Sequence, residues 1–555
     1  VDDSGFSTQG AFFDYDNDGD LDLYVLNHSV LEYSTLGKIT SYHKKLKNYA
    51  YSDRLLRNDN GKFVDVTEDS GLISNILGFG LGIALSDINK DGFTDIYISN
   101  DYNEQDYLYL NNGDGTFTEG LEDYIGHTSL YSMGSDIADF NNDGFTDIMT
   151  LDMLPERNQR IKMTSGPDNF EKLSHLPKNG FYNQTMRNML QLNRGGEYFS
   201  EIGQFSGVSN TDWSWASLFT DLDNDGYKDL FITNGYLKDY TNMDFFNFIV
   251  QEKINERKNN VEMKLTELID KMPSILEENY AYKNNGDLTF TKMNDDWGFD
   301  QKTFSNAAAY ADLDNDGDMD LIVQNLENQV SIYRNNSEKF TKNNYLKISL
   351  NGMGENTSGI GAKLKVTTGD ITQIQEMFNT RGFLSSVDLN LNFGIGSFKT
   401  IDEVEVIWPN QKKQITRDVQ PNQKLTLFQK DATLDVKRNN APNTKLFEEV
   451  KAIDFTHQEN NHNDFKREIM LPHMLSTLGP KLAIGDVNGD GLEDAFIGGA
   501  KGAIGGIFLQ TKSGFVRSNK IDLQADATSE DIGALFFDAD ADKDLDLYVV
   551  SGGNE

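Results

Sequence analysis

A nine-residue acidic motif recurs seven times in the chain, and every copy runs directly into a short apolar segment. Positions 1, 5 and 9 are Asp in each copy, and position 3 is Asp or Asn. Hard oxygen donors at alternating positions of a tight turn suit one Ca²⁺, with a backbone carbonyl at position 7 as a further ligand. Gly at position 6 permits the sharp bend. The last copy has Lys543 there instead, so we expect it to bind more weakly. The copies begin at Asp14, Asp87, Asp139, Asp221, Asp312, Asp486 and Asp538.

Position 12 separates these loops from an EF-hand, in which a bidentate Glu closes the calcium site. Here position 12 is β-branched in every copy and lies in an apolar run typical of a buried strand. The loop therefore joins strand to strand, and the ligand set ends at position 9. The residues at position 12 are Val25, Ile98, Thr150, Ile232, Val323, Ile497 and Val549.

The predicted calcium ligands are the side chains at positions 1, 3, 5 and 9 and the carbonyl at position 7. They are Asp14, Asp16, Asp18, Asp20 and Asp22; Asp87, Asn89, Asp91, Phe93 and Asp95; Asp139, Asn141, Asp143, Phe145 and Asp147; Asp221, Asp223, Asp225, Tyr227 and Asp229; Asp312, Asp314, Asp316, Asp318 and Asp320; Asp486, Asn488, Asp490, Leu492 and Asp494; and Asp538, Asp540, Asp542, Asp544 and Asp546.

A hairpin pattern with an Asn- and Gly-rich turn accompanies five of the loops. Such residues supply the positive φ that tight turns require. Loop, strand and hairpin together make about four strands per unit, and the shortest spacing between loops, Asp87 to Asp139, is 52 residues. Four strands at that period are typical of a propeller blade. The hairpins cover residues 55–67, 108–120, 190–202, 281–293 and 331–343.

These units resemble FG-GAP (VCBS-type) repeats, as in the integrin α-subunit propeller, where such loops bind calcium between strands. The stretches NYLKISLNGMGENTSGIGAKLKV and RGFLSSVDLNLNFGIGSFKTIDEVEVIWPN resemble the ASPIC/UnbV domain. The combination is similar to cartilage acidic protein-like surface proteins of Bacteroidota. The resemblance implies the fold more strongly than the function, because propellers host many functions.

The expected fold is all-β, an integrin-α-like calcium-binding propeller that is seven-bladed when complete. We expect it over residues 1–343, with blades missing before residue 1, followed by an ASPIC/UnbV-like β domain over 344–430. A polar linker at 431–445 and the first blades of a second propeller at 446–555 complete the expectation. The alternative is one seven-bladed propeller with an inserted domain. A helical insertion near 241–275 interrupts the repeat with two amphipathic stretches that end at Pro273.

Charge and composition exclude several classes of protein. The 50 Lys and Arg against 88 Asp and Glu give a formal net charge of −38, which opposes binding of nucleic acid. The chain has no Cys, so it contains no disulfide and no thiolate metal site. No apolar run of about 20 residues is present, so no membrane span is expected in this chain.

Two side-chain groups invite a second interpretation. Trp213 and Trp215 alternate along a predicted strand and could form a platform for sugar rings, but packing between blades is the simpler interpretation. His457, His462 and His473 lie near Glu459 and Asp464, yet their spacing matches no metal signature, and a polar linker is favoured.

The sequence predicts a non-enzymatic, calcium-stabilised binding or scaffold protein outside the cytoplasm. Known nucleophile, zinc and phosphate-loop motifs are absent, and the clustered carboxylates are already assigned to calcium. Calcium loops of modest affinity fill where calcium is millimolar. The resemblance implies an outer-membrane surface lipoprotein in a cell-envelope complex, with a SusC/SusD-type importer or a glycan as candidate partners. The alternative is a carbohydrate-active propeller enzyme, a hydrolase or lyase, or a glycan-binding protein. For residues 241–275 the alternatives are partner docking and packing on neighbouring blades.

Overall fold

The computed structural model describes residues 5–30, 40–164, 174, 176–259, 264–436, 446–519, 523–525 and 527–553. The chain divides into two compact units, Val1–Arg438 and Asn439–Glu555. Strands dominate the described residues of both units, so the all-β prediction is confirmed.

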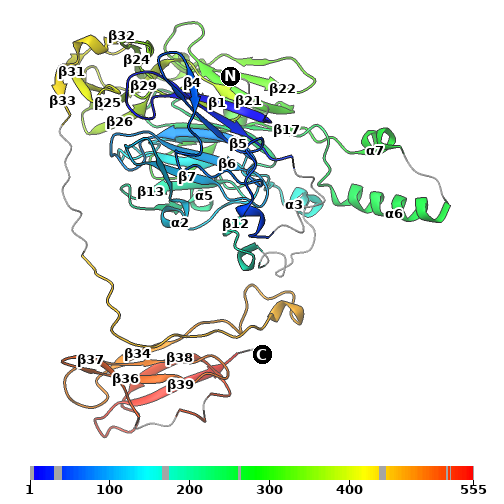
Figure 1. Ribbon diagram of the computed structural model, residues 1–555, viewed down its shortest axis with the longest axis vertical. Coiled ribbons are helices and arrows are strands. Elements are labelled where there is room, and N and C mark those ends of the chain that lie inside the picture. The colour runs from blue at the N-terminus through cyan, green and yellow to red at the C-terminus, as the bar shows by residue number, and fades with distance from the viewer. Residues whose placement is uncertain are drawn as a thin grey trace. The chain divides into compact units, whose positions relative to one another are not determined.

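Four antiparallel four-stranded sheets follow one another along the first unit, and we number them blades 1 to 4 (Figure 1). In every blade the first strand passes through an acidic loop into the second strand. Blade 1 contains β1 (Ser7–Phe13), β2 (Asp22–Asn27), β3 (Arg54–Asn58) and β4 (Phe63–Asp65). Blade 2 contains β5 (Gly80–Ser86), β6 (Asp95–Asn100), β7 (Tyr107–Asn111) and β8 (Phe117–Glu119). Blade 3 contains β10 (Ser135–Ala138), β11 (Asp147–Thr150), β13 (Met189–Asn193) and β14 (Phe199–Glu201). Blade 4 contains β15 (Ser214–Thr220), β16 (Asp229–Asn234), β18 (Tyr280–Asn284) and β19 (Phe290–Lys292).

Blade 5 has three strands, β21 (Ser305–Ala311), β22 (Asp320–Asn325) and β23 (Ser331–Tyr333). The prediction of a second hairpin strand within 331–343 is wrong, because the short helix α9 (Ser337–Phe340) lies where it was expected. The first strands pack side by side in the order β1, β5, β10, β15 and β21. Among the described residues these five sheets do not close into a ring.

Burial of the strands explains their apolar sequences. Every residue of β6 (DIYISN) is buried, because a central blade has a neighbouring blade against each of its faces. The second strands therefore read as short continuous apolar runs, whereas a sheet with one wet face would show alternation.

The segment that resembles the ASPIC/UnbV domain forms two sheets around a shared core. One sheet has the order β29 (Asn390–Gly396), β24 (Asn344–Asn351), β32 (Gln423–Phe428), with β24 and β32 parallel. The other has the order β26 (Ile371–Glu376), β25 (Lys363–Thr368), β30 (Ile401–Ile407), β31 (Lys412–Val419), β33 (Leu434–Asp435). Trp408 is fully buried between them. β33 lies inside the stretch predicted as linker, and residues 437–445 of that stretch are outside the described residues.

This domain belongs to the same compact unit as the blades. Its core side chains form one continuous hydrophobic cluster with side chains of blades 1 and 2. A small hairpin, β27 (Thr380–Arg381) and β28 (Ser385–Ser386), contacts the first strands of blades 2, 3, 4 and 5. Gln9 of blade 1 also donates from Nε2 to the carbonyl of Ser385 at 3.2 Å. The hairpin therefore touches the first strand of all five blades.

The predicted helical insertion is present as α6 (Met243–Asn259) and α7 (Leu265–Lys271), and it projects from the β body (Figure 1). Residues 260–263 between the helices are outside the described residues. The remaining elements of this unit are η1 (His43–Lys45), α2 (Leu121–Tyr124), β9 (Thr128–Ser129), α3 (Asn158–Thr164), β12 (Gln184–Thr185), α5 (Gly203–Ser206), β17 (Glu277–Glu278), α8 (Asn294–Trp297), β20 (Lys302–Thr303) and η2 (Gln429–Asp431).

The second unit repeats the blade pattern. A four-stranded sheet contains β34 (Leu482–Gly485), β35 (Asp494–Ile497), β36 (Gly506–Thr511) and β37 (Gly514–Arg517). It is followed by the strand pair β38 (Glu530–Phe537) and β39 (Asp546–Gly552), and the 3-10 helix η3 (Asp464–Lys466) precedes both. β34 packs against β38 as the first strands of neighbouring blades do in the first unit. In the part of the chain that is described, no helix is long and apolar enough to cross a membrane.

Candidate metal centres

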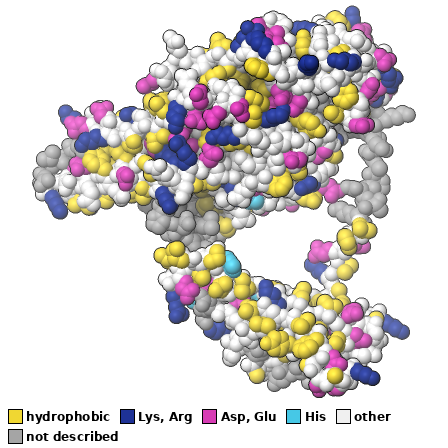
Figure 2. Space-filling view, turned by 180° about the vertical axis from the view of Figure 1, so that it is seen from behind, with side chains coloured by type: hydrophobic (Ala, Val, Ile, Leu, Met, Phe, Trp, Pro, Cys, Tyr) yellow, Lys and Arg dark blue, Asp and Glu magenta, His cyan; other side chains and the backbone are white. Residues whose placement is uncertain are grey.

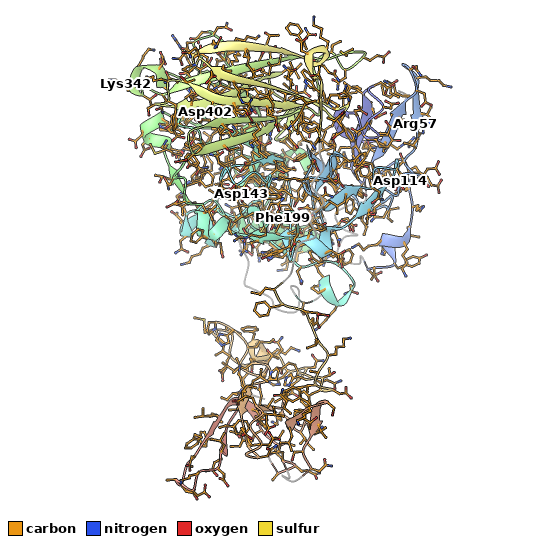
Figure 3. The ribbon with its side chains drawn as sticks, turned by 90° about the vertical axis from the view of Figure 1, so that its left-hand side faces the viewer. Arg57, Asp114, Asp143, Phe199, Lys342 and Asp402 are labelled. Atoms are coloured by element: carbon orange, nitrogen blue, oxygen red, sulfur yellow. The ribbon has the colours of Figure 1, made fainter. Side chains whose placement is uncertain are left out.

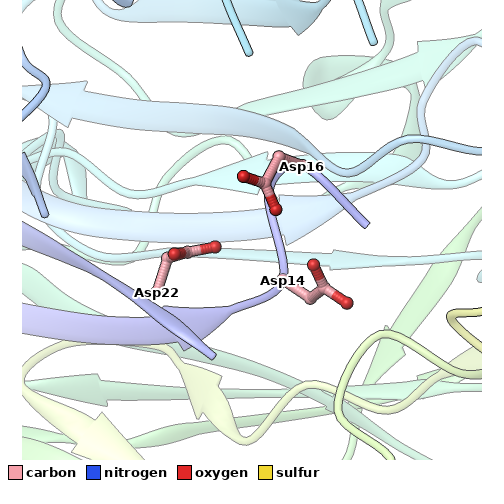
Figure 4. A group of neighbouring side chains, drawn as sticks. All are labelled: Asp14, Asp16 and Asp22. Carbon is pink, nitrogen blue, oxygen red and sulfur yellow. The ribbon is translucent and has the colours of Figure 1, made fainter. Parts of the chain in front are cut away.

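Carboxylates converge in the acidic loops that carry Asp at position 3. In the first loop, oxygens of Asp14, Asp16 and Asp22 lie within 4.8 Å of one another (Figure 4). In the loops that begin at Asp221, Asp312 and Asp538, the carboxylates at positions 1, 3 and 5 form such a group, also within 4.8 Å. In the Asp87, Asp139 and Asp486 loops position 3 is Asn, so an amide oxygen stands in place of one carboxylate. Oxygen-only donor sets of this kind are those that Ca²⁺ prefers.

Backbone hydrogen bonds give the loops a common shape. Gly19 donates from its N–H to Oδ2 of Asp14 at 3.1 Å, and position 6 donates to position 1 in the same way in five other loops. Position 7 donates its N–H to the carboxylate at position 5 in all seven loops. The position 7 N–H is thereby used inside the loop, and its carbonyl is the group predicted to contact the ion.

Position 9 has a second role that the sequence did not reveal. Asp22 accepts the N–H of Tyr15 at 3.0 Å and the N–H of Asn58 at 2.8 Å, one on each oxygen. Asp95, Asp229, Asp320 and Asp494 likewise each accept one N–H from position 2 of their own loop and one from the third-strand side of the blade. The predicted ligand at position 9 therefore also ties its loop to the third strand of the same blade.

In blades 2 to 5 an Asn at or just beyond the end of the third strand joins the blade to the preceding one. Asn111 donates from Nδ2 to the carbonyl of Tyr15 in the preceding loop at 2.8 Å and to the carbonyl of Thr94 in its own loop at 3.2 Å. Asn193, Asn284 and Asn335 make the equivalent pair of contacts in blades 3, 4 and 5. In the sequence this Asn stands just before the turn of the hairpin, a place that predicts a turn residue and gives no sign of the inter-blade contact.

The residue before this Asn matches the charge of the loop beside it. Where position 3 is Asp, the preceding residue is basic, namely Arg57, Lys283 or Arg334. Where position 3 is Asn, it is Leu110 or Leu192. Lys283 donates to both Asp223 and Asp225, and Arg334 lies 2.7 Å from Asp314 and 3.3 Å from Asp316. In the loops of blades 4 and 5 the extra carboxylate is thus paired with a cation at the end of the third strand, whereas Arg57 in blade 1 pairs with Asp59 of its own turn.

The first Asp of the loops in blades 1, 3 and 4 is crowded by other carboxylates in a poorly hydrated environment. Burial, followed by repulsion from neighbouring carboxylates, raises the pKa of Asp14, Asp139 and Asp221 to about 7 each, against partly offsetting contacts. Oδ1 of Asp87 is buried without a hydrogen-bond partner among the described residues, and so is Oδ1 of Asp318. A divalent cation would relieve the repulsion and satisfy these oxygens, so the residues present fit calcium.

The ASPIC/UnbV-like domain contacts several of the loops. Lys347 pairs with Asp312 at 3.0 Å, and Lys363 pairs with Asp87. Asn392 donates from Nδ2 to Oδ1 of Asn224 at 3.0 Å, and Gln411 donates to the carbonyl of Gly92 at 3.2 Å. The loops of blades 2, 4 and 5 are therefore contacted by protein, which leaves them poorly placed to receive an external ligand.

In the described structure the two tryptophans do not form an exposed platform, and the three histidines do not form a metal cluster. Trp213 is 5% exposed and stacks on Tyr236 with ring centroids 4.0 Å apart, and Trp215 packs 5.0 Å from Phe383. His457 pairs with Glu459 at 2.9 Å. Among the described residues, no metal-type grouping of acids and histidines includes His457, His462 or His473.

Comparison with known families supports the assignment of both repeat and domain. The family described as FG-GAP-like repeat matches residues 87–150, which span the second and third loops. The family described as ASPIC and UnbV matches residues 352–434. The chain therefore contains an FG-GAP-like repeat and an ASPIC/UnbV domain, as predicted. These domains fit an extracellular or adhesion-like β-rich protein. The expected similarity to proteins of Bacteroidota finds no support in these matches.

No curated protein matches the chain. Among solved structures, it is similar to an Agrocybe aegerita lectin that recognises non-reducing terminal N-acetylglucosamine, at 15% identity and a TM-score of 0.29, covering 60% of this chain and 67% of the lectin. The V. cholerae biofilm matrix protein Bap1 matches at 10% identity and a TM-score of 0.27, with 98% and 84% covered. Trypanosoma rangeli sialidase matches at 11% identity and a TM-score of 0.20, covering 66% of this chain and 56% of the sialidase. Superpositions this poor carry no argument about function.

Proposed function

We propose that the protein is a non-enzymatic, calcium-stabilised binding or scaffold protein that works outside the cytoplasm. The observation that carries the proposal is the convergence of carboxylates in loops of one shape, which in blades 4 and 5 are tied to the third strand and, through an Asn, to the preceding blade. A cation in such a loop would hold together the end of the first strand, the start of the second strand and the third strand of the blade. Without it, several like charges face each other at short range, which destabilises the folded state.

The projecting helical arm supports a binding role. Phe246, Val250 and Ile254 are exposed on α6 and lie four residues apart, so they share one face of the helix. Leu265 and Ile269 are exposed on α7 with the same spacing. Hydrophobic side chains are visible along the arm in Figure 2. Contiguous exposed apolar surface of this kind usually marks an interaction site, so we propose that the arm docks a partner protein.

A matched pair of variants tests the docking role. Phe246→Ser/Val250→Ser/Ile254→Ser removes the apolar face, whereas Glu252→Gln/Asn255→Gln changes two mutually bonded side chains on the opposite, polar face of the same helix. Both variants should melt like the parent protein in calcium, because the arm projects from the β body. A partner captured by the parent from cell-envelope extract should be retained by the polar variant and lost by the apolar one. Equal retention by both variants would contradict the docking role.

The proposed location is the cell surface, as an outer-membrane lipoprotein beside a SusC/SusD-type importer or in another envelope complex. Support comes from the extracellular character of FG-GAP-like and ASPIC/UnbV domains and from the concentration of calcium that such loops need. Protease treatment of intact cells checks it: cleavage at the exposed arm without cell lysis is expected, and full protection would contradict a surface location.

A further inference from the structure

The fourth strand of blades 2 to 4 carries a Phe that fills the space between blades. Phe117, Phe199 and Phe290 are only 4%, 6% and 8% exposed. Each shares a hydrophobic cluster with the side chain at position 2 of the preceding loop, which is Tyr15, Ile88 or Phe140 in turn. The ring centroids of Phe290 and Phe140 are 5.5 Å apart. Figure 3 labels Phe199, which lies in blade 3 as does Asp143 of the loop. These Phe side chains therefore lock the fourth strand onto the neighbouring blade.

Blade 5 lacks this strand, and a groove lies in its place. The groove has a volume of about 410 Å³ and is lined by the apolar side chains of Leu222, Trp297, Phe299, Met319, Leu321 and Tyr333. Leu222 is position 2 of the preceding loop, so the groove stands where a fourth-strand Phe would pack. β23 is the last strand of its sheet, so its outer edge is unpaired within the described residues. Ile332 on this edge is exposed.

The chain's own candidate residue does not enter the groove as part of a strand. Phe340 follows Asn335 at the spacing with which Phe63 follows Asn58, but it lies on α9, where it contributes to the lining of the groove and is still 86% exposed. In blade 4 the fourth strand runs away from the loop, since Phe290 pairs with Asn284 and Lys292 with Tyr282.

A strand through Phe340 would have to run the same way, yet the chain turns back at once. Asn343 donates from Nδ2 to the carbonyl of Asp223 in the preceding loop at 2.8 Å. β24 of the ASPIC/UnbV domain begins at the next residue, Asn344. Three residues after Phe340 cannot both extend along β23 and return to that loop, so this segment does not supply a fourth strand to blade 5.

We propose that the open edge of β23 binds an extended segment of a partner protein, added antiparallel as a fourth strand with an aromatic side chain in the groove. The register of blade 4 identifies the backbone groups that would bind it. The carbonyl of Ala281 accepts the N–H of Met293 from the fourth strand at 2.8 Å, and Ile332 stands at the equivalent position of β23. Strand addition of this kind combines backbone hydrogen bonds with side-chain pockets. The proposal rests on the binding role proposed above and assigns it a surface. This surface does not include the helical arm.

A peptide with the sequence of the chain's own blade 4 strand, DLTFTKM (residues 287–293), is the probe. Titrated as a fluorescent conjugate against the full chain in millimolar calcium, it should bind saturably. The same peptide with Phe290→Ser should bind about ten- to a hundredfold more weakly, the cost of not burying the ring. Ile332→Pro in the protein replaces an outward-facing edge N–H with a ring carbon, which should obstruct the added strand and weaken binding of the parent peptide. The apolar α6 variant should bind the peptide normally, so failure of arm docking is distinguishable from failure here.

The Phe340→Ser variant tests whether the groove receives an aromatic side chain of a partner strand or Phe340 of the chain itself. Because Phe340 is exposed, this variant should melt at the parent temperature and bind the peptide at least as well. Absence of saturable binding, equal binding of the two peptides, or a melting temperature lowered by several degrees in Phe340→Ser would each overturn the proposal. The two-peptide comparison uses the unaltered protein, so it decides the matter even if Ile332→Pro fails to fold.

Discussion

Arg381 donates from Nη1 to Oδ1 of Asp136 at 2.7 Å and to the carbonyl of Ile137 at 2.9 Å. Arg381 lies on the hairpin of the ASPIC/UnbV domain, and Asp136 lies on the first strand of blade 3 with 1% of its surface exposed. Two segments separated by 245 residues thus meet in a buried ion pair. The ASPIC/UnbV domain is therefore an integral part of the first unit and packs directly against the blades.

Arg381→Met tests that contact. Removing the guanidinium leaves the buried carboxylate of Asp136 without its charge partner, and breaking a buried pair in this way costs about 3–5 kcal/mol of unfolding free energy. Urea denaturation of the first unit within the full chain measures the loss. The double variant Arg381→Met/Asp136→Asn should recover part of it, because no buried charge then remains. Additive losses in the double variant would contradict a direct pair.

The Asn that joins neighbouring blades can be tested against the residue beside it. Asn284→Ala leaves the carbonyls of Phe140 and Lys228 without their donor, and we expect a loss of about 1–3 kcal/mol. Asn285→Ala is the matched control, because the hydrogen bonds of Asn285 in the described structure are to Thr289 and Thr291 of its own hairpin. It should change stability by less than about 0.5 kcal/mol. Equal effects would show that blade 4 does not depend on the inter-blade contact.

Lys283 should matter most when calcium is absent. Its ammonium pairs with Asp223 and Asp225, two predicted ligands, and the ion would take over that charge compensation. Lys283→Met should lower stability by about 1 kcal/mol in chelator and have a smaller effect in excess calcium. Thermal melts with and without calcium check this, with Lys253→Met on α6 as the control. A larger loss in calcium than in chelator would contradict charge compensation.

Buried carboxyls away from the loops predict a dependence on pH. Burial raises the pKa of Asp53 to about 7, although Asn27 and Tyr24 donate hydrogen bonds to it. The folded state therefore holds a proton that the unfolded state, with a pKa near 3.8, releases. This group favours folding fully below about pH 4, and its contribution is lost as pH rises towards about 7.

Asp53→Asn removes that titration. The stability of the variant relative to the parent should rise between about pH 4 and pH 7, by up to about 1.4 kcal/mol per pH unit. Denaturant unfolding of both proteins at several pH values measures the difference. Parallel pH profiles would show that Asp53 does not titrate in this range.

Local patterns account for what the sequence predicted correctly. The loops, the strands after them and the two helices of the insertion all follow from spacing within a few residues, such as the β-branched residue at position 12. The inter-blade role of Asn111 was missed because its acceptor, Tyr15, lies 96 residues away. The missing strand of blade 5 was also missed, because Phe340 keeps the local pattern while Asn343 and β24 redirect the chain. Contacts across blades decide these features, and no local periodicity records them.

Calcium in the acidic loops is the central claim, and thermal unfolding with metal analysis tests it most directly. The protein is melted in excess calcium and again after chelation, with its calcium content measured in both states. An ion bound only to the folded state stabilises it by about 2.7 kcal/mol per site at a hundredfold excess over Kd. We therefore predict several bound ions per chain and a melting temperature many degrees lower once they are removed. An unchanged melting temperature in protein shown to be free of metal would contradict the account.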